Sequence, residues 1–269
     1  DGSLAVKVGD IITLSYEDAA NDWGDPVTAT KTATMVGTVV VGTLSVNTTW
    51  PLDGSPYLLV GDVTLLPGKA LIVEPGVSVL FLPFTDVLES GSWSSRSELI
   101  IGVGGTLTAE GTPDDPVIFA STNVPPERGD WGAIIFEQGA GGTLSHCQVS
   151  GAVQGVLTWG SATSPTVENC FLTANETAIY ASSSSSPTIT GNTITGNGSY
   201  GIYLHGHSSS ATVSDNVISD NGDGVDIETV RYDFVFSGNT VSDNGGYGLK
   251  YYNYHSGGGS WATDSITVT

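Results

Sequence analysis

Two carboxylates, Asp226 and Glu228, stand two residues apart in the last fifth of the sequence. In a β-strand, alternate side chains project from the same face, roughly 6.5 to 7 Å apart. That separation fits the acid and the base of an inverting glycoside hydrolase. A lyase would instead need a basic residue, for which Arg231 and Lys250 are the local candidates. Solvated polar residues on a strand are the alternative interpretation of the two carboxylates.

Aromatic side chains, with one histidine and one lysine, recur in the sequence around these carboxylates. Flat aromatic faces suit sugar rings, while polar neighbours bind the hydroxyl groups. Aromatic ladders that only stabilise strand pairing are the alternative. The predicted ligand-binding residues are Trp159, Tyr180, Tyr203, His205, Lys250 and Tyr252.

An acidic segment near the N-terminus is the strongest candidate metal site, ahead of Asp114-Asp115 and the segment from Asp220 to Asp223. Asp18, Asn21, Asp22 and Asp25 carry the oxygen ligands that Ca²⁺ prefers, although their spacing is not that of an EF-hand. We expect either a calcium site or an ordinary acidic turn there, and the sequence indicates no other cofactor.

The charge balance excludes several classes of partner. The 269 residues include 7 basic and 28 acidic side chains, which gives a formal net charge of −21. Nucleic acids and anionic membrane surfaces need clustered Lys and Arg, so neither is expected as a partner. Pro, Gly and charged residues interrupt every long apolar stretch, and no membrane span is predicted.

These residues belong to a chain that repeats itself. Four similar segments begin at Pro165, Pro187, Ala211 and Phe234, and a pair formed by a small and an apolar residue recurs from Gly132 to Gly248 in steps of 23 or 24. A period of this length, with β-branched residues at alternate positions and Asn-Gly turns, predicts coils of short strands that stack in parallel. The asparagines that match between the repeats are predicted to form a buried hydrogen-bonded ladder, Asn169, Asn192, Asn216 and Asn239.

The period also predicts which side chains share the outer surface of one sheet. Counting alternate positions from each small and apolar pair gives two outward columns. The first is Ile134, Leu157, Tyr180, Tyr203, Asp226 and Lys250, and the second is Phe136, Trp159, Ser182, His205, Glu228 and Tyr252.

Two further features bear on the cellular compartment. Cys147 and Cys170 lie 23 residues apart at equivalent repeat positions, so they form either a disulfide between adjacent coils or two stacked free thiols. A disulfide would favour an oxidising compartment. Asn47, Asn175 and Asn197 match the N-glycosylation sequon, a pattern that is frequent by chance in a chain rich in Ser and Thr.

The repeats, together with GGTLTAEGTPDDPVIFAS from Gly104 and GDWGAIIF from Gly129, resemble those of right-handed parallel β-helix proteins. That group includes pectate lyases, polygalacturonases and surface proteins, and the resemblance runs from about Ser55 to Tyr252. It implies an all-β solenoid, which at this length is about eight coils. In the polysaccharide enzymes of the group, the predicted aromatic face forms the substrate groove.

We therefore expect a short N-terminal β cap over residues 1–45, a right-handed parallel β-helix over 46–255, and a glycine-rich hinge with a terminal strand over 256–269. The expected protein is secreted or at the cell surface and non-enzymatic, and it binds glycans or partner proteins through the aromatic face. The alternatives are a polysaccharide hydrolase or lyase that uses Asp226 and Glu228, and a structural subunit that assembles end to end by strand pairing.

Overall fold

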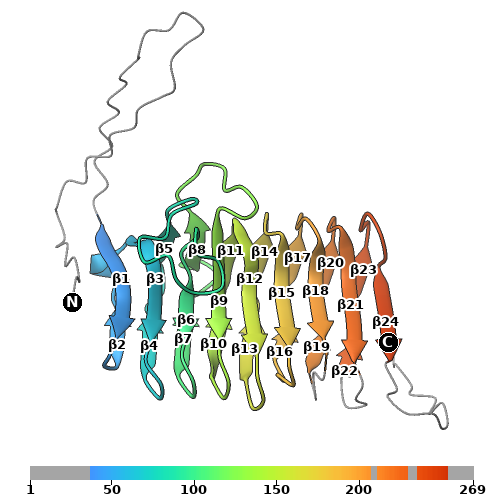
Figure 1. Ribbon diagram of the computed structural model, residues 1–269. Helices are drawn as coiled ribbons and strands as arrows, with labels where there is room; N and C mark the ends of the chain where they lie inside the picture. Colours follow the sequence, from blue (N-terminus) through green and yellow to red (C-terminus); the bar gives the residue numbers. More distant parts are fainter. Residues whose placement is uncertain (1–36, 207–210, 230–234, 254–269) are drawn as a thin grey trace, which may run out of the picture.

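The chain forms a solenoid of short β-strands. The computed structural model describes residues 37–206, 211–229 and 235–253, and in this part of the chain the strands stack from β1 at one end to β24 at the other (Figure 1). Every strand pairing among the described residues is parallel. The described residues make about nine turns, close to the eight that the repeat period predicts.

Each full coil contributes one strand to each of three faces. Face A consists of β2 (Thr48–Trp50), β4 (Ala70–Val73), β7 (Thr106–Glu110), β10 (Gly141–Ser145), β13 (Ser164–Glu168), β16 (Thr188–Thr190), β19 (Thr212–Ser214) and β22 (Val235–Ser237). Face B consists of β5 (Ser78–Phe81), β8 (Val117–Ser121), β11 (Cys147–Ser150), β14 (Phe171–Thr173), β17 (Thr193–Thr195), β20 (Val217–Ser219) and β23 (Thr240–Ser242). Face C consists of β6 (Leu99–Ile101), β9 (Trp131–Phe136), β12 (Ala152–Trp159), β15 (Thr177–Ser182), β18 (Tyr200–His205), β21 (Asp223–Thr229) and β24 (Leu249–Asn253).

The first coil joins faces B and C through one long strand, β3 (Tyr57–Leu65), which pairs with β5, β6 and β1 (Thr38–Leu44). A short 3₁₀ helix, η1 (Leu52–Gly54), precedes β3. Parallel pairing therefore starts at Thr38, inside the segment assigned to the N-terminal cap. Residues 1–36 of that segment, and the hinge at 256–269, lie outside the described residues.

Aliphatic side chains fill the interior in continuous stacks. Alternate strand residues point inward, and the constant register places equivalent side chains above one another. One such stack on face A comprises Leu144, Val167, Ile189, Val213 and Phe236. Burying each of these side chains contributes on the order of 1.5 to 3 kcal/mol, so the stacks hold successive coils in register.

The turn from face A to face B places a buried asparagine inside successive coils. The backbone N–H and the side-chain amide of Asn192 both donate to Oδ1 of Asn216 at 2.9 Å, and Asn216 repeats this pattern with Asn239. The Asn192 amide also donates to the carbonyl oxygen of Val167 in the preceding coil. These bonds satisfy polar groups that would be costly to bury without partners.

Asn169 does not belong to this ladder, contrary to the prediction. Its side chain is exposed, and its backbone has a φ of 52°. The register pairs Glu168 with Thr190, so Asn169 corresponds to Gly191 and Cys170 takes the buried position. The Cys170 N–H donates to Oδ1 of Asn192 at 2.9 Å. Aligning the repeats by their asparagines therefore shifted the predicted register of this coil by one residue.

A second ladder, which the sequence analysis missed, lines the turn from face B to face C. It comprises Asn175, Asn197, Asn221 and Asn244, and each backbone N–H donates to the amide oxygen of the next member at 3.0 or 3.1 Å. Each of these asparagines is the last residue of one of the four repeated segments. This shared position is the feature of the sequence that could have predicted the second ladder. Asn175 and Asn197 are buried in the ladder, so their sequons are not accessible in the folded chain, whereas Asn47 is exposed.

Candidate functional site

The outer surface of face C carries most of the predicted ligand-binding residues. The register aligns Leu157, Tyr180, Tyr203, Asp226 and Lys250 in one column and Trp159, Ser182, His205, Glu228 and Tyr252 in the other. We call the surface formed by Tyr180, Tyr203, His205, Glu228 and Lys250 the face C patch. The backbone of Tyr252 pairs with Glu228, and its side chain lies outside the description.

Ile134 and Phe136 do not extend these columns, which corrects the predicted outward positions. Both side chains are fully buried in the core. Ile134 pairs with Val156 and Ala133 with Gln154, so Gly155 is an extra residue in β12 that shifts the register by one. The outward residue of β9 is therefore Ile135, which pairs with Leu157.

Three tyrosine rings and one imidazole pack together on strands β15 and β18. The ring centroids of Tyr180 and Tyr203 lie 5.1 Å apart, and those of Tyr200 and Tyr203 lie 4.7 Å apart. The ring of His205 lies 6.4 Å from that of Tyr180. Tyr200 was not predicted from the sequence, because it precedes the small and apolar pair from which the columns were counted.

Polar atoms of the patch form a closed hydrogen-bonded group. The Tyr203 hydroxyl lies 3.0 Å from Nδ1 of His205 and donates to Oε2 of Glu228 at 3.3 Å. Nδ1 of His205 lies 3.1 Å from the same carboxylate oxygen. Burial and then the charge of Glu228 raise the pKa of Tyr203 well above its ordinary value, so the hydroxyl stays protonated as a hydrogen-bond donor.

Asp226 occupies a more enclosed position than its neighbours. It is 1% exposed, and its Oδ2 accepts a hydrogen bond from Nζ of Lys250 at 2.8 Å. Its Oδ1 is buried without a hydrogen-bond partner. A carboxylate this far from solvent is poorly placed to activate a hydrolytic water, and removing its lysine would leave a buried charge unpaired.

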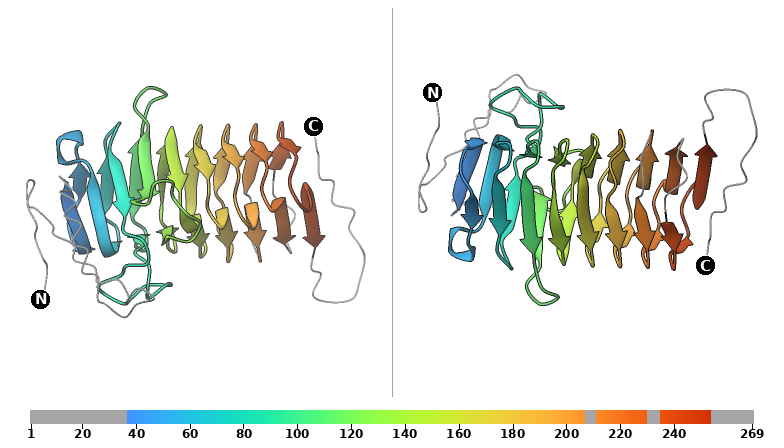
Figure 2. Two further views of the ribbon diagram at one scale, coloured as in Figure 1. Left: turned by 90° about the horizontal axis from the view of Figure 1, so that it is seen from above. Right: turned by 90° about the horizontal axis from the view of Figure 1, so that it is seen from below.

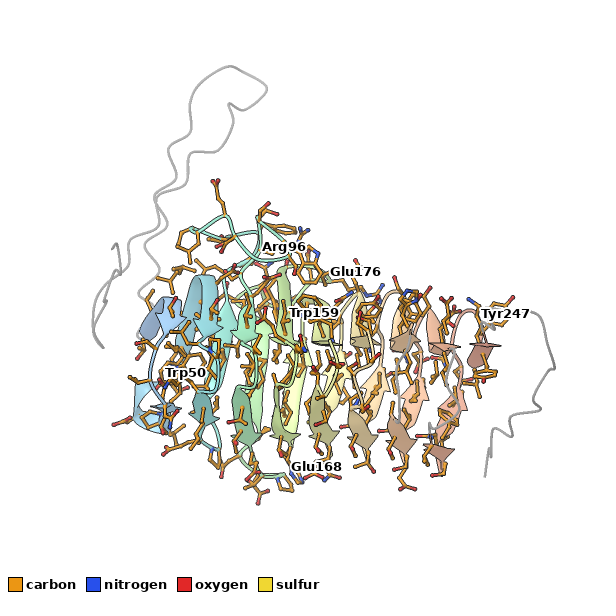
Figure 3. The ribbon with its side chains drawn as sticks, turned by 60° about the horizontal axis from the view of Figure 1, so that its bottom comes forward. Trp50, Arg96, Trp159, Glu168, Glu176 and Tyr247 are labelled. Carbon is orange, nitrogen blue, oxygen red and sulfur yellow. The ribbon has the colours of Figure 1, made fainter. Side chains whose placement is uncertain are left out.

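Trp159 stands apart from the tyrosine cluster at the end of β12. Trp159, labelled in Figure 3, is 47% exposed, more than any described Tyr or Phe side chain of the face C strands. The column places Ser182, which is almost buried, between Trp159 and His205. Trp159 is therefore two coils, or roughly 9.6 Å, from the hydrogen-bonded group.

A loop over residues 82–98 covers the outer surface of face C on the N-terminal side of the patch. It projects from the row of strands as the teal segment of Figure 2. Its Trp93 packs with Ile100, Leu157 and Tyr180 around a small apolar cluster. Trp93 was not predicted from the sequence, because the loop lies outside the repeat and has no period. Trp93 ends the patch on this side.

Three buried carboxylates hold this loop in place. Glu98 accepts hydrogen bonds from the N–H groups of Ser92 and Trp93, while Asp62 accepts from Ser90 and from the backbone of Glu98. The third, Asp86, accepts two N–H groups of its own loop. Burial is the main reason that the pKa of Glu98 rises to about 7, and burial also raises the pKa of Asp62.

No metal centre is found within the described ranges, where no group of three His, Cys, Asp or Glu side chains is placed to hold an ion. Asp18, Asn21, Asp22 and Asp25 lie outside these ranges, so calcium binding there stays a prediction.

Cys147 and Cys170 are both buried and free, which is one of the two arrangements expected from the sequence. The backbone N–H of Cys147 donates to Sγ of Cys170 at 3.3 Å. Burial, and then the neighbouring thiol, raise the pKa of Cys147. The two cysteines thus continue the asparagine ladder into the preceding coils.

Comparison with known proteins gives one match. The family model of the right-handed β-helix region matches residues 125–260, just over half of the chain. No curated protein and no solved structure matches. None of the described helices is long and apolar enough to span a membrane. The family match and the parallel coils agree, and the chain belongs to the right-handed β-helix family.

Proposed function

We propose that this protein is a non-enzymatic, secreted or cell-surface module that binds neutral glycans through the face C patch. The observation that carries the proposal is the cluster of Tyr180, Tyr203 and His205 beside Glu228 on a flat sheet. The rings offer stacking surface to a sugar, and the hydroxyl, imidazole and carboxylate offer both donors and acceptors.

The charge of the chain favours a neutral ligand over a uronate polymer. The net charge is −21, and the patch contains Glu228 and one lysine, Lys250, which is already paired with the buried Asp226. Like charges repel over roughly 8 to 10 Å at ordinary ionic strength. An acidic polysaccharide would therefore meet repulsion across the patch.

The contacts of the two carboxylates support binding over catalysis. Asp226 is buried against Lys250, and Glu228 is engaged by Tyr203 and His205. An inverting hydrolase needs a water between its acid and its base, with both groups reachable by substrate. A hydrolase or lyase that uses Asp226 and Glu228 is thus the weaker alternative.

Two other expectations stay predictions. Abundant Gly, Ser, Thr and Asn with few basic residues are typical of secreted β-proteins and support the proposed location. End-to-end assembly was predicted from the terminal segment at 256–269, which lies outside the described residues. Light scattering against concentration tests assembly, and a strictly monomeric full chain, unchanged by deleting residues 256–269, would remove it.

The experiment is a binding and turnover screen with a panel of neutral and acidic polysaccharides. We expect retention by at least one neutral polymer in affinity electrophoresis, with no new reducing ends and no unsaturated products. Tyr203→Ala should weaken that binding about tenfold, because it removes the central ring of the cluster.

The control is Val217→Ala, which removes exposed apolar surface from face B and should leave this binding unchanged. Binding of equal strength in Tyr203→Ala would contradict the proposal. Product formation that is lost in Asp226→Ala would replace it with the enzymatic alternative.

A further inference from the structure

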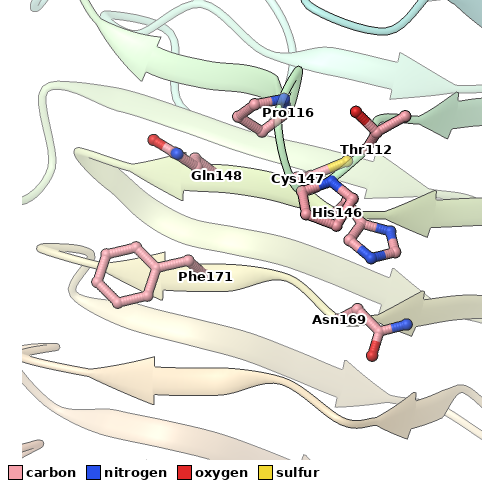
Figure 4. A pocket seen from close by; sticks show the side chains of 8 residues that line it. Thr112, Pro116, His146, Cys147, Gln148, Asn169 and Phe171 are labelled. Carbon is pink, nitrogen blue, oxygen red and sulfur yellow. The ribbon is translucent and has the colours of Figure 1, made fainter.

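A pocket of about 140 Å³ opens at the corner between faces A and B, away from face C. Pro113 and Pro116 of the loop between β7 and β8 form one wall. His146 and Asn169 approach from the turns of the next two coils, and Gln148 and Phe171 from strands β11 and β14 (Figure 4). The pocket is smaller than the 300 to 1,000 Å³ typical of sites for drug-sized ligands, so its occupant is small.

The residues in the pocket depart from the repeat. His146 and Asn169 occupy the left-handed turn position, with φ of 50° and 52°, where later coils have Gly191, Asp215 and Gly238. Gly and Asp suit that conformation at least as well as His. The left-handed backbone conformation alone therefore does not explain why a histidine occupies this turn.

The neighbouring outward column on face B departs in the same two coils. Gln148 and Phe171 are followed in register by Thr193, Val217 and Thr240, which are small or β-branched residues. Among the described coils of this column, the Gln148 amide and the Phe171 ring thus occur only in the two coils that face the proline loop. The Phe171 ring is 42% exposed, an unusual loss of burial for a phenylalanine.

The lining contains no carboxylate, lysine or arginine, and acidic residues lie around it. The floor includes Cys147, whose buried thiol is un-ionised because burial raises its pKa. Glu110 and Glu168 flank Ser145 in register on face A, one residue before the turn. Because these flanking charges are acidic, they would repel an anionic ligand.

Donors and acceptors surround the apolar surfaces. The amides of Gln148 and Asn169 can each donate and accept hydrogen bonds. Nδ1 of His146 lies 3.1 Å from Oγ of Ser145, so the other ring nitrogen is directed away from that contact. A ring with hydroxyl groups at its edge and C–H groups on its face would use the phenyl surface and the amides together.

We propose that this corner pocket binds one neutral sugar residue, at a site separate from the face C patch. Phe171 provides the stacking surface, and Gln148, Asn169 and His146 bind the hydroxyl groups. The site would take a chain end or a branch residue, because its volume does not accommodate an extended polymer.

Saturation-transfer NMR with glucose, galactose, mannose and N-acetylglucosamine as probes tests the proposal on the full chain. At least one probe should receive saturation. Phe171→Ala should weaken its binding about tenfold. Asn169→Gly should weaken it at least threefold without loss of fold, because Gly191 and Gly238 hold the same turn position.

Val217→Ala is the matched control, since Val217 is an exposed apolar residue of the same column outside the pocket. No saturation transfer from any probe, or transfer unaffected by both pocket variants, would overturn the proposal. Transfer that is lost in Tyr203→Ala but kept in Phe171→Ala would likewise overturn it, and would place the sugar on face C. Failure of the corner pocket leaves the face C proposal standing.

Discussion

At the scale of single residues, buried carboxylates stand out, because most acidic groups of the described residues are at least partly exposed. Glu98 is fully buried, and Asp62 and Asp86 are nearly so. The C–H groups of Glu98 and the ring of Trp93 press on strand β9 where Gly132 lies, and a Cβ there would come within 2.6 Å of Glu98 Cγ. Of the three carboxylates that hold this loop, Glu98 is thus the one that also packs against face C.

Glu98→Gln should therefore change how stability depends on pH. The pKa of Glu98 rises from 4.5 to about 7 on folding, so the folded state favours the protonated form. Its contribution is fully present below pH 4.5 and is lost as the pH rises through about 7. The neutral amide avoids this loss and should add about 3 kcal/mol at pH 8 relative to wild type.

Urea unfolding at pH 4.5 and pH 8 measures this effect. We expect the two proteins to be nearly equal in stability at pH 4.5 and to differ at pH 8. A variant that is less stable than wild type at both values would show that the ionised carboxylate is required to hold Ser92 and Trp93.

At the scale of elements, the turns explain both what could be predicted and what could not. The period of 23 or 24 residues follows from side chains that must stack coil upon coil, so the fold class and most of face C were accessible from sequence. Which residue of one turn points inward could not be predicted, because a register shift of one residue places Cys170, and not Asn169, at the buried ladder position. The loop with Trp93 and Glu98 was also hidden, because nothing in it repeats.

The ladder distinguishes two asparagines that look alike in sequence. Asn192→Ala removes an acceptor for the Cys170 N–H and donors to Val167 and Asn216, and should cost about 2 to 4 kcal/mol of unfolding free energy. Asn169→Gly, at an exposed turn position, should cost less than about 0.5 kcal/mol.

Chemical denaturation monitored by tryptophan fluorescence measures both variants. Equal losses of unfolding free energy would mean that Asn169 and Asn192 occupy equivalent positions in their coils, and that the one-residue register shift is wrong.

At the scale of the whole molecule, a constant parallel register converts a repeating sequence into long flat faces. The core and the ladders stabilise the coils, and the outer columns are free to vary. Variation is concentrated at two places, the tyrosine cluster on face C and the corner pocket between faces A and B. The fold of the family leaves activity open, since one solenoid can support many surfaces.

The most direct test of the central claim is to map a bound neutral oligosaccharide by amide chemical shifts on the isotope-labelled full chain. The oligosaccharide is a fragment of the polymer that the binding screen selects. The account predicts shifts on β15, β18, β21 and β24 and at the indole of Trp93, and these shifts should need about tenfold more ligand in Tyr203→Ala. Saturable binding whose shifts fall elsewhere, with face C unaffected, would contradict it.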